Sequence, residues 1–166
     1  MLVIADSSPF VALVKIGHVD VLPKLFGAVM IPPAVADELA NSKRPQAVRD
    51  FIGKRPQWLS IHAPTSVENI PNLDLGEREA ISLARELKAD VLLIDEADGV
   101  EAAMARHIPI TRTAALLRDA ANRGLLDLKQ TFERLRATNF RIKQEVLDGL
   151  LKQHEEFRKQ RESRKP

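Results

Sequence analysis

Four carboxylates mark the places in this chain where chemistry could occur. Asp6 and Asp95 each directly follow a short apolar run that is typical of a buried strand, while Glu38 and Glu77 fall in segments with helical character. Ligand and catalytic groups of open α/β sheets collect at the C-terminal ends of the strands, so we expect both aspartates there. If the fold brings all four carboxylates together, their like charges require neutralisation by protons or cations.

A cluster built only from carboxylate oxygens favours Mg²⁺ or Mn²⁺ over zinc. The chain contains no cysteine, which excludes thiol catalysis, a cysteine-ligated zinc site and a disulfide framework. The four histidines fall outside the acidic motifs, and we interpret them as structural or exposed. They are His18, His62, His107 and His154.

Each carboxylate also has a purely structural interpretation. Asp6 precedes two serines and a proline, an order typical of a helix N-cap. Glu77 would lie in the first turn of a helix, where the helix dipole favours acids. Glu38 could be a solvated helix residue, and Asp95 could be a cap. The functional hypothesis therefore depends on the order and spacing of the four residues together.

The elements that must position these residues alternate between strand and helix. Apolar runs at residues 2–5, 28–31, 91–94 and 109–111 predict strands, and residues 58–62 a further extended piece. This alternation indicates an α/β fold with a parallel sheet and helical crossovers. Helices are predicted at 9–16, 19–26, 32–41, 44–53, 76–87, 100–105, 114–123, 128–137 and 142–159, with fraying at 160–166.

Composition places the chain among compact globular proteins. It has 166 residues, 45% of them hydrophobic, and no apolar run approaches the roughly 18 residues of a membrane span. The N-terminus reads as a core strand and not as a signal peptide, so we expect a cytoplasmic protein. From residue 133 onward ten Lys/Arg face six Asp/Glu, a net +4 against +2 for the whole chain. The basic residues of such a C-terminal segment usually serve only to solvate it, and phosphate binding is the alternative.

Beyond these patterns the sequence resembles the PIN-domain nucleases, and in particular a prokaryotic branch of predicted nucleic-acid-binding proteins related to the toxin ribonucleases of toxin–antitoxin pairs. The resemblance covers residues 2–126 and implies a three-layer α/β/α sandwich with a central parallel sheet over residues 1–126. Residues 127–166 would then form a helical extension that packs on the same domain and ends in a basic tail. The motifs are VIADSSP at 3–9, LVKIG at 13–17, LFG at 25–27, IPPAVADEL at 31–39, LDLGEREAISLA at 73–84 and LIDE at 93–96.

The resemblance implies an endoribonuclease that depends on Mg²⁺ or Mn²⁺, with catalytic and metal-binding acids that fall on Asp6, Glu38, Glu77 and Asp95. A further outer acid would be Glu96 or Asp98. Phosphodiester hydrolysis fits such a site, because one or two divalent ions lower the pKa of the attacking water and clamp the phosphate oxygens. Single-stranded RNA is the expected substrate, because the scissile phosphate must reach a recessed metal.

The resemblance also implies partners, namely a small antitoxin protein and a second copy of the chain in a homodimer. Two apolar groups, at residues 19–26 and 146–151, are candidate dimer surfaces. Ser7, Ser8 and Arg112 are candidate substrate-binding residues. Arg112 stands where the family usually has a small residue, so it could either contact a phosphate or obstruct the substrate.

Two other functions remain open from the sequence. The alternative within the family is a PIN-fold module that binds RNA or a protein without cutting. The retained set of four acids favours the enzyme, because a binding module would gain nothing from their repulsion. An unrelated Mg²⁺ phosphatase is disfavoured, because Asp6 is followed by Ser7 and Ser8 and not by an Asp-x-Asp nucleophile pattern.

Overall fold

Five short strands form one all-parallel sheet in the computed structural model, which describes residues 1–165. The strand order is β3-β2-β1-β4-β5, with Ile4 opposite Met30 and Ala5 opposite Leu93. This confirms the predicted α/β class with a central parallel sheet, and the extended piece near residue 60 is an edge strand. The strands are β1 Val3–Ala5, β2 Val29–Ile31, β3 Leu59–Ile61, β4 Val91–Leu93 and β5 Ile110–Thr111.

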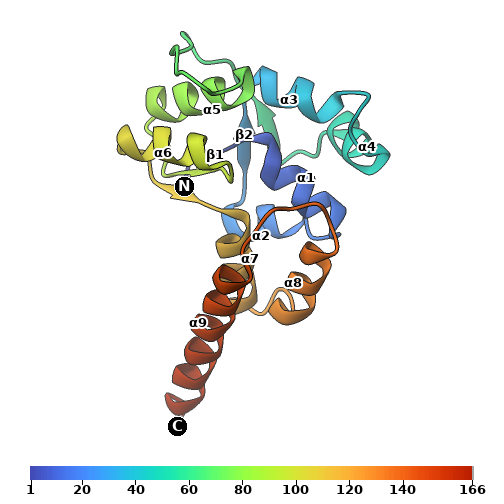
Figure 1. The fold of residues 1–166 in the computed structure, drawn as a ribbon, viewed down its shortest axis with the longest axis vertical. Helices are drawn as coiled ribbons and strands as arrows, with labels where there is room; N and C mark the ends of the chain where they lie inside the picture. Colours follow the sequence, from blue (N-terminus) through green and yellow to red (C-terminus); the bar gives the residue numbers. More distant parts are fainter. Residues whose placement is uncertain (166) are drawn as a thin grey trace. The chain divides into compact units, whose positions relative to one another are not determined.

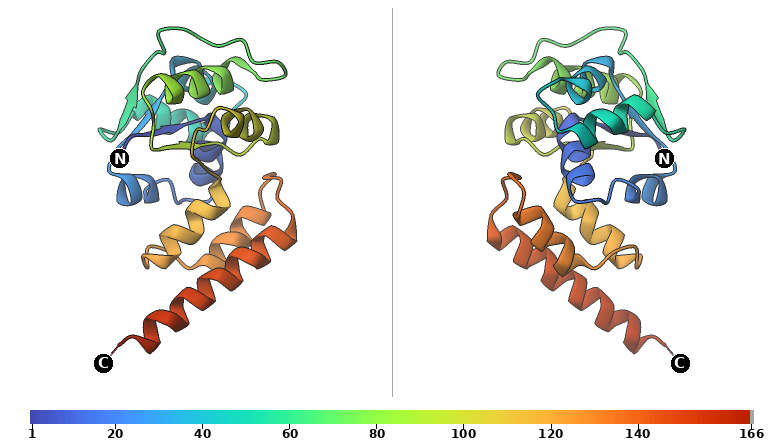
Figure 2. Two further views of the ribbon diagram at one scale, coloured as in Figure 1. Left: turned by 90° about the vertical axis from the view of Figure 1, so that its left-hand side faces the viewer. Right: turned by 90° about the vertical axis from the view of Figure 1, so that its right-hand side faces the viewer.

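Helices cover both faces of this sheet. Figure 1 shows α5 and α6 on one side of the strands, and α1 and α4 on the other. The long connection from β3 to α5, residues 62–74, follows α5 in Figure 2 and is held to it by two hydrogen bonds from Thr65 to Glu86, each 2.7 Å. The helices that flank the sheet are α1 Ser7–Lys15, α2 Val21–Phe26, α3 Pro33–Ala40, α4 Gln46–Lys54, α5 Leu75–Glu86 and α6 Ala97–Ala105.

The core follows directly from the apolar runs of the sequence. All three residues of β1 are buried, because a central strand of a parallel sheet is covered on both faces. On the α1 and α4 side, Phe10, Phe51 and Trp58 pack together with ring centroids 5.7 to 6.4 Å apart. Trp58 is half-buried and serves as a packing residue.

The chain divides into two compact units, Met1–Arg112 and Thr113 onward. The sequence placed this boundary at residue 126, after the helix that follows β5. In the structure that helix, α7 Thr113–Asn122, packs on α8 Leu128–Arg136 and α9 Gln144–Ser163, and so belongs to the second unit. No helix in the described part of the chain is both long and apolar enough to cross a membrane.

Helix α9 continues past the point where fraying was expected. The prediction was wrong for residues 160–163, which complete the helix to Ser163. Lys, Arg, Gln and Glu are good helix formers, and Arg158 and Glu162 form an i,i+4 pair at 4.0 Å. The last residue, 166, lies outside the described residues.

Candidate functional site

Asp6 lies at the C-terminal end of the central strand β1. Its backbone amide donates a hydrogen bond of 2.9 Å to the carbonyl of Leu93, which fixes it against the end of β4. The strand order reverses between β1 and β4, and ligand sites of open parallel sheets lie at that switch point. The residue is 2% exposed, so its carboxylate is buried at the position where chemistry is expected.

The Asp6 side chain does not cap the following helix. The residue occupies the N-cap position of α1, yet its carboxylate makes no capping hydrogen bond. The hydroxyl of Ser8 lies 3.4 Å from Oδ2, and within the described residues Oδ1 has no hydrogen-bond partner. A buried carboxylate oxygen without a partner costs free energy, so the capping interpretation does not explain this residue.

Burial raises the pKa of Asp6 from its ordinary value of 3.8 to about 7. The backbone amide of Ser7 lowers it in part, whereas the charges of Glu38, Glu77 and Asp74 raise it further. At neutral pH Asp6 therefore stands near its midpoint of ionisation, in a group of carboxylates that repel one another.

Glu38 reaches this group from α3, which packs on α5. Its carboxylate accepts hydrogen bonds from the Ser7 hydroxyl and the Gly76 amide, while burial is the main cause that raises its pKa. The carboxylate lies directly against the Cα of Gly76, where any Cβ would overlap Oε1. Glycine at position 76 is therefore required for Glu38 to lie where it does.

Glu77 combines a structural and a chemical position. Asp74 and Glu77 form a capping box at the start of α5: the Glu77 amide donates to Asp74 Oδ1 at 2.8 Å, and the Asp74 amide donates to Glu77 Oε2 at 3.1 Å. The other oxygen, Oε1, lies beside Gly99 of α6, 3.2 Å from where a Cβ would be. Burial raises the pKa of Glu77, and the charges of Asp74, Glu96 and Glu38 add to the rise.

Asp74 is a fifth acid of the group that the sequence analysis missed. Its charge acts on Asp6, Glu38 and Glu77 alike. The spacing Asp74-x-x-Glu77 before an apolar helical stripe is a capping-box signature, and that signal was present in the sequence.

The remaining predicted acids lie at the same edge of the sheet. Asp95 is half-buried just after β4, and the preceding Ile94 amide bonds the carbonyl of Thr111 in β5 at 3.2 Å. Glu96 is the N-cap residue of α6, and its charge acts on Glu77, whereas Asp98 is exposed in the first turn of α6. Of the two alternatives for an outer acid, Glu96 is the one that the electrostatics connect to the group.

The candidate substrate-binding residues differ in their placement. Ser7 is buried and bonded to Glu38, and Ser8 is directed to Asp6, so both serines orient carboxylates. Arg112 is exposed directly after β5, and its guanidinium makes no hydrogen bond or ion pair with residues 1–165. Its guanidinium is therefore available to a phosphate at this sheet edge.

The donor set fits a divalent ion that retains water ligands. Among residues 1–165, no three Asp, Glu, His or Cys side chains are arranged so that they could hold an ion together. Mg²⁺ is usually bound through one or two carboxylates and keeps several waters. The unpaired Oδ1 of Asp6 suits such an ion, with the neighbouring glutamates as partners for its waters.

Comparison with known proteins agrees with this architecture. The family model DUF3368, described as a PIN domain, matches residues 2–156. A PilT N-terminus domain protein, SSO1118 from the hyperthermophilic archaeon Sulfolobus solfataricus P2, has a similar structure with a TM-score of 0.51. The similarity covers 72% of this chain and 93% of that one at 17% sequence identity, so it concerns the fold alone. No curated protein matches the chain.

Proposed function

Since the chain belongs to the PIN domain family, we propose that it is a divalent-metal-dependent endoribonuclease that cleaves single-stranded RNA. The proposed site is the group of acids around the C-terminal ends of β1 and β4. Phosphodiester hydrolysis is the chemistry that a carboxylate group with Mg²⁺ or Mn²⁺ performs best.

One observation carries the proposal: the orphaned oxygen of Asp6. A carboxylate that is buried, unpaired at Oδ1 and surrounded by other carboxylates is unfavourable in the protein alone. Neighbouring acids make the arrangement worse unless a cation or a proton is present. An arrangement that costs stability is typical of a functional site.

Asp6 and Asp95 are the residues that we propose to hold the metal, with Glu38 and Glu77 in contact with it directly or through water. When bound, a divalent ion supplies a water of lowered pKa and charge that opposes the phosphate. Ser7 and Gly76 hold Glu38 in one orientation, and the capping box holds Glu77. Because burial raises the pKa of both glutamates, either carboxylate is better able to accept a proton from water.

The substrate and partners follow from the same site. A recessed acidic group admits a flexible single strand more readily than a duplex, and exposed Arg112 would receive a phosphate beside it. We propose further that the protein acts as the toxin of a toxin–antitoxin pair, neutralised by a small antitoxin protein. Coexpression with the product of an adjacent small reading frame tests this, with growth arrest expected only in its absence.

We also propose that the chain forms a homodimer. In the first of the two predicted apolar groups Val21, Leu22 and Leu25 are buried, whereas Val19 and Phe26 are half-buried. On α9, Val146 is 48% exposed, whereas Leu147 is buried. Light scattering at micromolar concentration should give twice the chain mass, and Val146→Asp should give a folded monomer. A monomeric parent would contradict the dimer.

Cleavage of a labelled, unstructured RNA tests the enzymatic function. We expect cleavage with Mg²⁺ or Mn²⁺, none with EDTA, and a loss of at least 100-fold in Asp6→Asn. Asp98→Asn is the matched control, since it removes an exposed carboxylate at the same sheet edge. Equal activity of the parent and Asp6→Asn would refute the proposal.

The alternative is a PIN-fold module that binds RNA or a protein without cutting. The observation in its favour is that no three-ligand group is present among residues 1–165. RNA binding that persists without any metal-dependent cleavage would support this alternative.

A further inference from the structure

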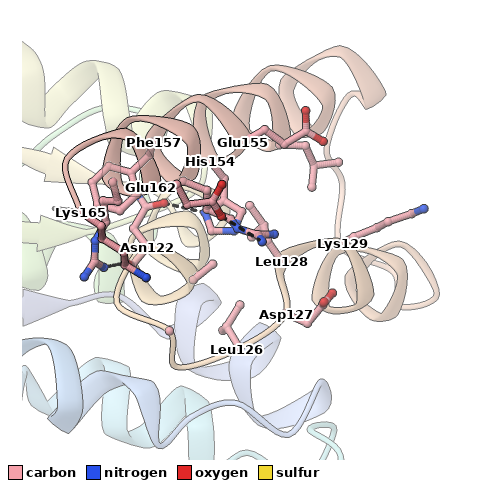
Figure 3. Close-up of a pocket in the computed structure, with 15 residues that line it drawn as sticks. Asn122, Leu126, Asp127, Leu128, Lys129, His154, Glu155, Phe157, Glu162 and Lys165 are labelled. Carbon is pink, nitrogen blue, oxygen red and sulfur yellow. Dashed lines mark hydrogen bonds and ion pairs between the residues drawn. The ribbon is translucent and has the colours of Figure 1, made fainter.

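A groove of about 780 Å³ lies within the second unit of the chain. Its two sides are the C-terminal half of α9 and the segment that joins α7 to α8, as the close-up in Figure 3 shows. None of the acids of the proposed catalytic site belongs to it. The groove is therefore a separate surface whose chemistry can be considered by itself.

The wall of this groove combines apolar and aromatic groups. Leu126 and Leu151 line it, together with Phe157, which is 36% exposed. His154 also lines it, and its Nδ1 lies 2.6 Å from Oδ1 of Asn122, which fixes the plane of the ring. Two rings on one helix, three residues apart, offer flat surfaces within a solvent-filled groove.

Cations gather along the same side of α9. Arg158 and Arg161 line the groove from α9, three residues apart and so on one helix face, while Lys165 lines it from just past the end of the helix and Lys129 from α8. The Arg161 guanidinium lies 5.9 Å from the centre of the Phe157 ring. Residues 157–165 contain five Lys/Arg and a single acid, so this stretch carries a net charge of +4.

Two of the three acids that line the groove already have partners, and one of those partners, Arg158, lines the groove as well. Asp127 caps α8 by accepting a 2.8 Å hydrogen bond from the Gln130 amide. Glu162 pairs with Arg158 at 4.0 Å, which leaves Glu155 as the acid of the lining without such a role. The groove therefore presents a positive excess beside exposed aromatic surface.

We propose that this groove binds single-stranded RNA, with phosphates on Arg158, Arg161 and Lys165 and a base stacked on Phe157. The inference rests on the proposed ribonuclease function for the identity of the polymer. Non-specific single-strand sites combine a positive groove with aromatic side chains, because every base has a flat face and every nucleotide a phosphate. An acidic catalytic site repels the backbone, so the substrate must be held by a basic surface outside it.

Fluorescence anisotropy of a labelled 20-nucleotide unstructured RNA tests the proposal on the full chain. EDTA is present throughout, so that no cleavage occurs and binding is measured alone. The groove variant removes three of the four cations that line the groove, leaving Lys129, and the control removes three cations close to them in the sequence that do not line it. The groove variant is Arg158→Gln/Arg161→Gln/Lys165→Gln, and the control is Lys152→Gln/Lys159→Gln/Arg164→Gln.

We expect the groove variant to weaken binding about ten-fold or more, and the control less than three-fold. The slope of log K against log salt should fall by about 2 for three lost phosphate contacts on a single strand. Phe157→Leu should weaken binding about ten-fold with the salt slope unchanged, because stacking is lost and no charge is. Equal losses in the two triple variants, or no loss in either, would overturn the groove as the RNA site.

The same experiment separates this inference from the proposed activity. Asp6→Asn should bind RNA as the parent does, while losing cleavage when Mg²⁺ is supplied. RNA that binds in the groove without being cut would defeat the enzymatic function and leave the inference standing. If a leucine–glutamate peptide needs the three groove cations and RNA does not, the groove is a peptide site and the RNA inference fails.

Discussion

Replacing Asp6 by asparagine should make the metal-free protein more stable at alkaline pH. The pKa of Asp6 is raised from 3.8 to about 7, so the folded state binds the proton more tightly than the unfolded state does. Ionisation therefore costs folding free energy, and this cost develops as the pH rises from about 4 to about 7 and is complete above that. Asparagine has no such ionisation.

The size of the effect follows from the shift. A difference of about 3 pKa units at 1.36 kcal/mol each gives a cost of about 4 kcal/mol at pH 8, as an upper bound. The buried amide of asparagine brings unsatisfied N–H groups that cost about 1 to 3 kcal/mol at every pH. The net stabilisation at pH 8 is then about 1 to 3 kcal/mol, and the pH-dependent part isolates the carboxylate.

Urea denaturation in EDTA between pH 4 and pH 8 measures both terms. The difference in unfolding free energy between Asp6→Asn and the parent should rise by up to about 4 kcal/mol across this range in favour of the variant. Asp98→Asn, at an exposed position, is the control. A variant that is less stable by the same amount at every pH would show that Asp6 is not a destabilising buried carboxylate but an ordinary structural hydrogen-bonding residue.

Two further predictions concern the neighbours of Asp6. Gly76→Ala should abolish most of the RNA cleavage with little change in thermal stability, because a Cβ at that position displaces the flexible end of Glu38. Gly149→Ala is the control, since a Cβ there meets nothing within 4 Å. Parent-like cleavage by Gly76→Ala would contradict the placement of Glu38. Asp74→Ala should lower the unfolding free energy by about 1 kcal/mol, because the capping box is lost, and it should also release Glu77 from its fixed position. Calorimetry should therefore show a lower melting temperature, and the RNA assay should show less cleavage. A change in only one of these two measurements would separate the capping role of Asp74 from a role in catalysis.

Most of the fold could be predicted from the sequence because its elements are locally consistent. Short apolar runs that alternate with helical patterns indicate buried strands. The match to the PIN domain family agrees with this fold. The boundary between the two units was not predictable in this way. Whether α7 packs on the sheet or on α9 depends on tertiary contacts that periodicity alone does not report.

The sequence named three acids whose charges act on one another in the structure, Asp6, Glu38 and Glu77, but it did not indicate the residues that hold them in place. The position of Asp6 follows from the strand before it, because a residue directly after the central strand β1 must lie at the C-terminal edge of the sheet. The bond from Ser7 to Glu38 and the contact of Glu38 with Gly76 join residues that are distant in the sequence. Only the capping box of Asp74 had a local signal that could have been used.

Calorimetric titration of Mn²⁺ into the metal-free protein tests the central claim, that the buried Asp6 group binds a divalent cation. We expect saturable binding in the parent, with release of about 0.9 proton at pH 6 and about 0.1 at pH 8, because an ion displaces the proton of a carboxyl whose pKa is about 7. Asp6→Asn should bind the ion at least ten-fold more weakly and release no proton. Binding of Mn²⁺ by Asp6→Asn with the affinity and proton release of the parent would show that Asp6 does not hold the ion.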